Sequence, residues 1–194
     1  MHRIRNYVLD GGNFLMIGGW ESFHGLNGEY NDTPVADVLP VILGEKDDRV
    51  NYGGGVLVFP GRDRGPVPDD LDWEYPPLIG GYNAFTPKRG TRQHLYGKKI
   101  RISGKPGKTD LQLCGGDIPL FVSGRQGKGR SAALAFDLAP HWIGPMVDWG
   151  SERKHVDLEA GFIEVGDMYY RFVSRLLKMM TTNSEGINKR SERL

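Results

Sequence analysis

A short apolar run between two glycine pairs, followed by a turn rich in reactive side chains, is the feature that most constrains this chain. The run is residues 14–17, Phe-Leu-Met-Ile, and it lies between the glycine pairs at 11–12 and 18–19. Such a run is typical of a buried strand in a parallel sheet. Proteins of the α/β class place binding and catalytic groups at the carboxyl ends of these strands. We therefore predict a strand over residues 13–17 and a candidate site in the turn that follows it.

The net charge and the cysteine content argue against a nucleic-acid-binding, membrane-binding or disulfide-bonded protein. The chain has 194 residues, which suits a single domain, and its formal net charge of +1 gives no long-range attraction to nucleic acid or to an anionic membrane. Its single cysteine, Cys114, excludes an internal disulfide and fits a reducing compartment. No apolar run approaches the roughly 20 residues that a membrane-spanning helix needs. We expect a soluble, cytoplasmic protein that binds neither nucleic acid nor membrane.

Two short helices are predicted on either side of this first strand. Apolar residues within 4–8 fall at helical spacing, and the glycine pair at 11–12 ends the pattern, so the chain opens inside a helix. Thr33 is a typical N-cap residue, and Pro34 occupies the first helical position after it. Pro40 is expected to end this second helix early.

The middle and second half of the chain contain several strand patterns. Residues 60–90 are rich in Pro, Gly and Asp, and we expect a long functional loop there. Strands are predicted at 53–59, 96–103, 110–114, 118–123 and 131–137, the last two forming an antiparallel hairpin around 124–130.

A final helix is the most regular pattern in the sequence. Residues 165–180 carry apolar side chains at i, i+3, i+4 and i+7, which predicts a core-facing stripe that includes Leu176 and Leu177. Residues 181–194 are polar and lack periodicity, which indicates a flexible tail. The domain organisation predicted from these patterns is one domain over residues 1–180, followed by this tail.

Five blocks carry a resemblance to a known family. They are residues 12–25 (GNFLMIGGWESFHG), 30–41 (YNDTPVADVLPV), 77–83 (PLIGGYN), 124–130 (GRQGKGR) and 136–142 (FDLAPHW). In this order they resemble the glutamine amidotransferase-like family, which belongs to the class I glutamine amidotransferase-like superfamily. The resemblance implies a flavodoxin-like three-layer α/β sandwich with a mostly parallel sheet, to which the hairpin would be an antiparallel extension. The family begins with a further strand–helix unit of roughly 30 residues or more, so the resemblance also implies that this chain lacks that unit.

The resemblance implies a cysteine nucleophile in the turn after the first strand and a histidine after a later strand. Trp20 stands at or next to the nucleophile position, whereas His141 follows the strand predicted at 131–137, as the resemblance requires. Cys114 precedes a turn between two strands, where no helix N-terminus would lower its pKa, so we expect an ordinary thiol. The site is therefore predicted to lack its reactive sulfur.

Other catalytic arrangements have weaker support in the sequence. Ser22 with Glu21 and His141 could supply a nucleophile and a base, but the turn lacks the glycines of a Gly-x-Ser-x-Gly elbow. The histidines and carboxylates do not have metal-ligand spacing, so no metal is predicted. Residues 124–130 depart from the phosphate-loop pattern and join two strands, and no cofactor is expected.

Aromatic and polar residues around the expected carboxyl edge indicate a pocket for an unknown small molecule. Residues of these types are equally typical of loops that cover a sheet edge, so both interpretations stay open. The candidate ligand-binding residues are Gly18, Gly19, Trp20, His24, Tyr30, Tyr82, Asn83 and Trp142.

Three functions are compatible with these patterns. The first, which we favour, is a pseudo-enzyme that kept the ligand pocket and lost the nucleophile. The second is a hydrolase that uses His141 with Glu21, Ser22 or an activated water molecule. The third is an interaction module that forms homo-oligomers through an exposed sheet edge.

Overall fold

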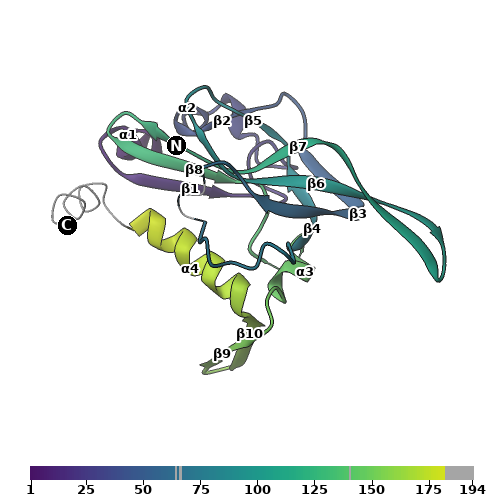
Figure 1. The fold of residues 1–194 in the computed structure, drawn as a ribbon. Helices are drawn as coiled ribbons and strands as arrows, with labels where there is room; N and C mark the ends of the chain where they lie inside the picture. Colours follow the sequence, from purple (N-terminus) through teal and green to yellow (C-terminus); the bar gives the residue numbers. More distant parts are fainter. Residues whose placement is uncertain (64, 66, 140, 182–194) are drawn as a thin grey trace, which may run out of the picture.

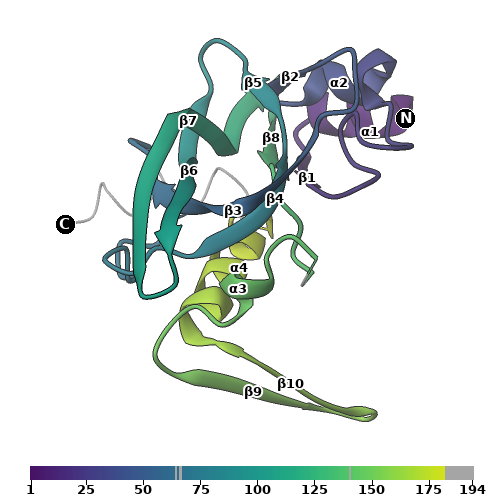
Figure 2. The same ribbon diagram turned by 90° about the vertical axis from the view of Figure 1, so that its right-hand side faces the viewer.

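The computed structural model describes residues 1–63, 65, 67–139 and 141–181, which form a six-stranded mixed sheet, two separate two-stranded sheets and the helices around them (Figure 1). In both views α3 and α4 lie on one side of this sheet, and α1 and α2 lie near the end formed by β1 and β8 (Figures 1 and 2). The elements in chain order are α1 (His2–Leu9), β1 (Asn13–Ile17), η1 (Tyr30–Asp32), α2 (Pro34–Val38), β2 (Val41–Leu43), β3 (Arg49–Pro60), β4 (Leu78–Asn83), β5 (Phe85–Pro87), β6 (Arg92–Lys105), β7 (Lys108–Gln126), β8 (Gly129–Leu134), α3 (Gly144–Val147), β9 (Arg153–Leu158), β10 (Gly161–Gly166) and α4 (Asp167–Thr181).

The first helices and the first strand form where local signals predicted them. After α1 the chain turns through Gly11, whose φ of +123° favours glycine, and β1 begins at Asn13. Thr33 caps α2 by accepting a hydrogen bond at Oγ1 from the backbone N–H of Val35 at 3.3 Å. Pro34 is the first residue of α2, so these two helices and β1 are confirmed.

The main sheet is mixed rather than mostly parallel. Its six strands have the order β1-β8-β7-β6-β3-β4, and within the described residues β1 and β8 are its one parallel pair. The predicted parallel sheet is wrong because β6, β7 and β8 follow one another through tight turns, which leave no room for a crossover helix. The antiparallel hairpin predicted around 124–130 is present as β7 and β8, and the α/β class holds. The flavodoxin-like architecture is not confirmed.

Besides β2, two longer regions contain strands that the sequence patterns did not predict. The expected loop at 60–90 includes β4 and β5, because Gly80 and Gly81 are extended strand residues rather than turn residues. A Cβ on Gly81 would lie 2.5 Å from Nε1 of Trp142, so the glycine leaves room for an indole that packs on β4. The second unpredicted feature is the β9–β10 hairpin, which forms a separate two-stranded sheet.

The core lies between the main sheet and α4. Phe172 of α4 is buried against Phe136, with ring centroids 6.4 Å apart, and Leu176 is buried one turn later. The predicted core stripe is wrong at Leu177, whose side chain is 54% exposed. Within the described ranges, no helix is both long enough and apolar enough to cross a bilayer. The predicted tail lies outside the described residues, except for Thr181, which ends α4.

Candidate functional site

The candidate site is built on the carboxyl ends of the parallel pair β1 and β8. Gly18 follows β1 and donates its backbone N–H to the carbonyl of Leu134 at 2.7 Å, which continues the pairing with β8 past the end of β1. A Cβ on Gly18 would lie 2.5 Å from the carbonyl oxygen of Ala135, closer than side chains pack. Gly19 then turns the chain at a φ of +149°, which favours glycine. The two glycines therefore let the chain leave the sheet beside β8.

Asn83, the last residue of β4, fixes this turn. Its side chain is fully buried, and its Oδ1 accepts a hydrogen bond from the backbone N–H of Gly19 at 2.8 Å. Its Nδ2 donates to the carbonyl of Gly19 at 3.1 Å and to Oδ1 of Asp48 at 2.7 Å. Its backbone N–H donates to the carbonyl of Ala135 at 2.7 Å. Asn83 therefore joins β4, the turn after β1 and the end of β8.

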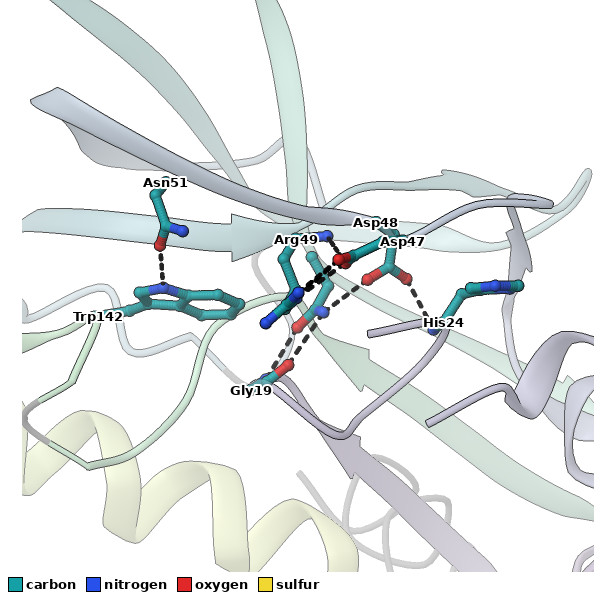
Figure 3. Close-up of polar contacts among 8 residues, drawn as sticks. Gly19, His24, Asp47, Asp48, Arg49, Asn51 and Trp142 are labelled. Atoms are coloured by element: carbon teal, nitrogen blue, oxygen red, sulfur yellow. Dashed lines mark hydrogen bonds and ion pairs between the residues drawn. The ribbon is translucent and has the colours of Figure 1, made fainter. Parts of the chain in front are cut away.

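Asp48 is a buried carboxylate that the sequence analysis missed. Its Oδ2 accepts a hydrogen bond from the backbone N–H of His24 at 2.9 Å, so it holds the loop after β1 at a residue beyond the Gly19 turn (Figure 3). Burial raises the pKa of Asp48, and the hydrogen bonds from Asn83 and His24 partly oppose this shift. In the sequence, Asp48 lies in a charged stretch that is typical of a solvated loop, so no local signal marked it as buried.

Trp20 lies at the surface of the site, and its ring is close to a guanidinium group and to an imidazole ring. The guanidinium of Arg49 lies 4.8 Å from the centre of the Trp20 ring, and the His141 ring lies 5.0 Å away on a tilted plane. The Trp20 side chain remains 44% exposed. Arg49 is held by Asp47, and hydrogen bonds from Arg49 lower the pKa of that carboxyl to about 2.

His141 is placed by the segment that follows β8. Its Nδ1 lies 3.4 Å from Oδ2 of Asp137, and its ring stacks near that of Trp142 at 6.0 Å between centroids. Asp137 also accepts a hydrogen bond at Oδ1 from the backbone N–H of Trp142 at 3.3 Å. Burial raises the pKa of the Asp137 carboxyl. An imidazole that faces a partly buried carboxylate on one side and an exposed aromatic ring on the other can accept or donate a proton.

Trp142 connects the segment that carries His141 to two strands of the main sheet. Its indole Nε1 donates to Oδ1 of Asn51 on β3 at 2.8 Å, so the ring bridges β3 and β4 (Figure 3). The carbonyl of Trp142 accepts the backbone N–H of Gly80 at 2.7 Å. Trp142 is almost fully buried, and its ring stacks near that of His141.

The structure brings most of the predicted site residues together, but not all of them. The turn residues Gly18, Gly19 and Trp20 and the later residues Asn83, His141 and Trp142 form one continuous group, as the contacts above describe. Among the described residues, no hydrogen bond or ion pair joins the side chain of Glu21 or Ser22 to His141. The remaining predicted ligand-binding residues, His24, Tyr30 and Tyr82, are part-buried or buried beside the core.

The thiol and metal alternatives find little geometric support. Cys114 lies on β7 in register with Lys99, and its Sγ is 3.9 Å from the hydroxyl of Tyr52 on β3. Because Cys114 is the single cysteine of the sequence, the turn after β1 contains no thiol. Across residues 1–63, 65, 67–139 and 141–181, no three His, Cys, Asp or Glu side chains gather as a metal site requires.

Comparisons with known proteins give the family. The chain is similar to the cytoplasmic protein STM3548 of Salmonella typhimurium, at 25% identity and a TM-score of 0.67, over 92% of this chain and 58% of that one. It is also similar to the cytoplasmic protein STM1381 of Salmonella typhimurium LT2, at 30% identity and a TM-score of 0.57, over 75% of this chain and 52% of that one. The chain thus spans little more than half the length of these two proteins, and no curated protein matches it. A family model described as "Putative glutamine amidotransferase" matches residues 1–157. Since this match covers most of the chain and the resemblance of the five sequence blocks agrees with it, the chain belongs to this glutamine amidotransferase-like family.

Proposed function

We propose that this chain is a ligand-binding glutamine amidotransferase-like domain without glutaminase activity. One observation carries the proposal: Trp20, not cysteine, follows the glycine pair at the carboxyl end of β1. Glutamine hydrolysis by a thiol requires a thiolate close to its histidine base. The single thiol, that of Cys114, has the Tyr52 hydroxyl as its neighbour instead.

The ligand surface that we propose is the exposed face of Trp20 with its neighbours His141 and Arg49. An indole flanked by an imidazole and a guanidinium offers a flat apolar contact and hydrogen-bond donors at its edge. The charge of Arg49 is compensated by Asp47, and His141 faces Asp137. A planar small molecule with at most one negative charge fits this arrangement better than a strongly charged ligand.

The buried residues of the site have a positioning role in this proposal. Asn83 and Asp48 hold the backbone that carries Trp20, and Trp142 supports His141. Tyr82 is a core residue, and Gly18 and Gly19 provide space and turn geometry rather than ligand contacts. We also propose a cytoplasmic location, which the names of the two similar Salmonella proteins support.

The absence of glutaminase activity is tested with L-glutamine as substrate. We expect glutamate release by the purified protein to equal that of a buffer blank, and to be unchanged in the His141→Ala variant. Glutamate release that requires His141 would overturn the proposal, because it would show that another group replaces the thiol.

Ligand binding at Trp20 is tested by saturation-transfer NMR with a set of planar aromatic acids and amides, such as indole-3-acetate and nicotinamide. We expect at least one compound to give a transfer signal that the Trp20→Ala variant loses. Tyr75 is a more exposed aromatic residue that is not among the residues of the site, so Tyr75→Ala should keep the signal. Equal signals in all three proteins would contradict a site at Trp20.

A second candidate function rests on the contact between Nδ1 of His141 and Oδ2 of Asp137 at 3.4 Å. A carboxylate behind an imidazole orients it as a base for water, which is the geometry of general-base hydrolysis. Its test is the hydrolysis of p-nitrophenyl acetate by the wild type, His141→Ala and Asp137→Asn. Hydrolysis that falls in both variants favours this function over a non-catalytic domain, and equal background rates exclude it for this substrate.

A further inference from the structure

A serine and a histidine outside the candidate site share a hydrogen bond between the neighbouring strands β6 and β7 (Figure 1). Oγ of Ser123 on β7 lies 2.7 Å from Nε2 of His94 on β6. His94 is buried, with 2% of its surface exposed, whereas Ser123 is partly exposed. The backbones of the two strands are already paired, so this bond adds to a contact that exists without it. A partly exposed hydroxyl with a buried imidazole behind it is the arrangement of a serine nucleophile and its base.

The partner of the other ring nitrogen fixes the direction of this hydrogen bond. Nδ1 of His94 contacts the backbone carbonyl of Asp63, and a carbonyl oxygen only accepts, so Nδ1 carries the proton. Burial lowers the pKa of His94, so the ring is neutral and Nε2 keeps its lone pair. Nε2 therefore accepts the hydrogen bond that the Ser123 hydroxyl donates. An imidazole in this state is ready to take the hydroxyl proton, as the base of a catalytic serine does.

A β-bulge places His94 for this contact. The residues before and after His94 on β6 pair with consecutive residues of β7, Val122 and Phe121, so His94 is an extra residue in its strand. Its ring lies against that of Phe121, with centroids 5.0 Å apart. Ser123, two residues from Phe121, lies on the same face of β7. Bulges redirect side chains in this way and are frequent beside active sites.

The loop after β3 packs on the base. The backbone N–H of Gly61 donates to the carbonyl of His94 at 2.7 Å, and Oδ2 of Asp63 accepts the backbone N–H of Gln93 at 3.3 Å. Gly65 has a φ of +43°, and a Cβ there would lie 3.0 Å from Cε1 of the His94 ring. The loop therefore fixes the orientation of the imidazole and covers its Nδ1 side, which leaves Nε2 for the hydroxyl.

Two arginines flank the hydroxyl on its own face of the sheet. Arg92 pairs directly with Ser123, and Arg125 follows Ser123 by two residues on β7, so the three side chains point to the same side. Both arginines are exposed. Guanidinium groups bind carboxylates, and they stabilise negative charge that develops on an oxygen. The surroundings of Ser123 therefore favour a substrate that carries an acidic group.

We propose that Ser123 and His94 form a second site, independent of the surface at Trp20, which hydrolyses carboxylic esters with an acidic group in the acyl part. Oγ of Ser123 bonds to the carbonyl carbon while its proton passes to Nε2 of His94. The bond to the alcohol oxygen then breaks, and the alcohol leaves with that proton. Water next attacks the acyl-serine and gives a proton to Nε2. The acyl–Oγ bond breaks, Oγ regains the proton, and the acid is released. Arg92 and Arg125 bind the acidic group.

The nucleophile is identified by labelling the wild-type protein with a biotin-linked fluorophosphonate. In this reaction Oγ bonds to phosphorus, fluoride leaves and the proton passes to His94. Ser103, an exposed serine near the outer end of β6, is the internal control, and peptide mass spectrometry measures the label at both serines. We expect Ser123 to be labelled at least about a hundredfold faster than Ser103. Equal labelling of the two serines, or none at Ser123, would overturn the proposal.

The base is tested with His94→Gln, because glutamine hydrogen-bonds but does not take a proton at neutral pH. We expect the labelling of Ser123 to slow at least about a hundredfold in this variant. Thermal unfolding checks that the variant is folded, and the comparison with Ser103 in the wild type decides the question without it. An unchanged labelling rate in folded His94→Gln would contradict a role of His94 as the base.

The substrate class is tested with two p-nitrophenyl esters, the neutral acetate and the acidic mono-adipate. We expect kcat/KM of the wild type to be at least about tenfold higher for the adipate, and Arg92→Ala to remove this preference. Arg101→Ala, which changes an exposed arginine farther along β6, should keep it. Ser123→Ala should abolish hydrolysis of the adipate. Hydrolysis that falls in His141→Ala but not in Ser123→Ala would belong to the candidate site instead, and it would overturn this inference while leaving the proposed function open to its own test.

Discussion

Asn83 donates a hydrogen bond from Nδ2 to Oδ1 of Asp48 at 2.7 Å, and both side chains are buried. The same amide group binds the backbone N–H and carbonyl of Gly19, and Asp48 binds the backbone N–H of His24. The turn after β1 and the loop that follows it are therefore held by two side chains, one from the end of β4 and one from the residue before β3. Any ligand surface at Trp20 depends on this pair.

Replacing Asn83 with alanine should destabilise the protein strongly. The change leaves a buried carboxylate without its side-chain donor and two backbone groups of Gly19 without partners, and we expect a loss of about 2–4 kcal/mol of unfolding free energy. Urea denaturation measures the difference. Asn27→Ala removes an exposed asparagine from the nearby loop and should change stability by less than about 0.5 kcal/mol. A similarly small loss for Asn83→Ala would show that the amide does not hold the turn.

A methyl group at Gly18 should be poorly tolerated. The new Cβ would lie 2.5 Å from the Ala135 carbonyl oxygen, and backbone atoms cannot move aside cheaply. We expect Gly18→Ala to cost about 1–3 kcal/mol or more, measured by thermal unfolding. Gly53→Ala is the control, since no heavy atom beyond its two chain neighbours lies within 4 Å of the added Cβ. Equal melting temperatures of the two variants would argue against the close approach of β1 and β8.

Two neighbouring leucines of α4 distinguish its buried face from its exposed face. Leu176 is fully buried against the core, whereas Leu177 is 54% exposed. Leu176→Ala should cost about 2–5 kcal/mol because it leaves a cavity, and Leu177→Ala should cost less than about 0.5 kcal/mol. Both variants keep helix propensity almost constant, so chemical denaturation compares packing alone. A larger loss for Leu177 would mean that α4 is rotated about its axis.

His94 should make stability fall as the solution is acidified. Its buried ring contacts the Ser123 hydroxyl at 2.7 Å and the carbonyl of Asp63, and burial lowers the pKa of His94 below its ordinary 6.5. The unfolded chain therefore binds a proton at a higher pH than the folded protein does. The stabilising contribution is present above about pH 6.5 and is lost as the pH falls below it.

The pH effect is measured as the difference in unfolding free energy between the wild type and His94→Gln from about pH 7.5 to pH 5.5. We expect the wild type to lose more stability over this range, since glutamine does not titrate. Parallel curves for the wild type and His94→Gln would contradict a neutral, buried His94.

Helices, strands and hairpins could be predicted where residues close together in the sequence favour them. The strand β1, the Thr33 cap of α2 and the β7–β8 hairpin follow from short-range patterns, and the structure confirms each one. The strand β4 could not be predicted, because Gly80 and Gly81 resemble a turn until Trp142, about sixty residues later, is placed beside them. The β9–β10 hairpin was missed because it is rich in charge and no buried face identifies it.

The sequence by itself determined the family, the short-range elements and the absence of a thiol in the turn after β1, because each of these is carried by residue types and their spacing along the chain. Tertiary structure decided that the sheet is mixed, that Asn83 and Asp48 hold the turn, and that Trp20 meets His141. These last features join residues far apart in the chain. They form because polar groups that are buried on folding must form hydrogen bonds with one another. A local sequence pattern does not show which distant groups will be buried together.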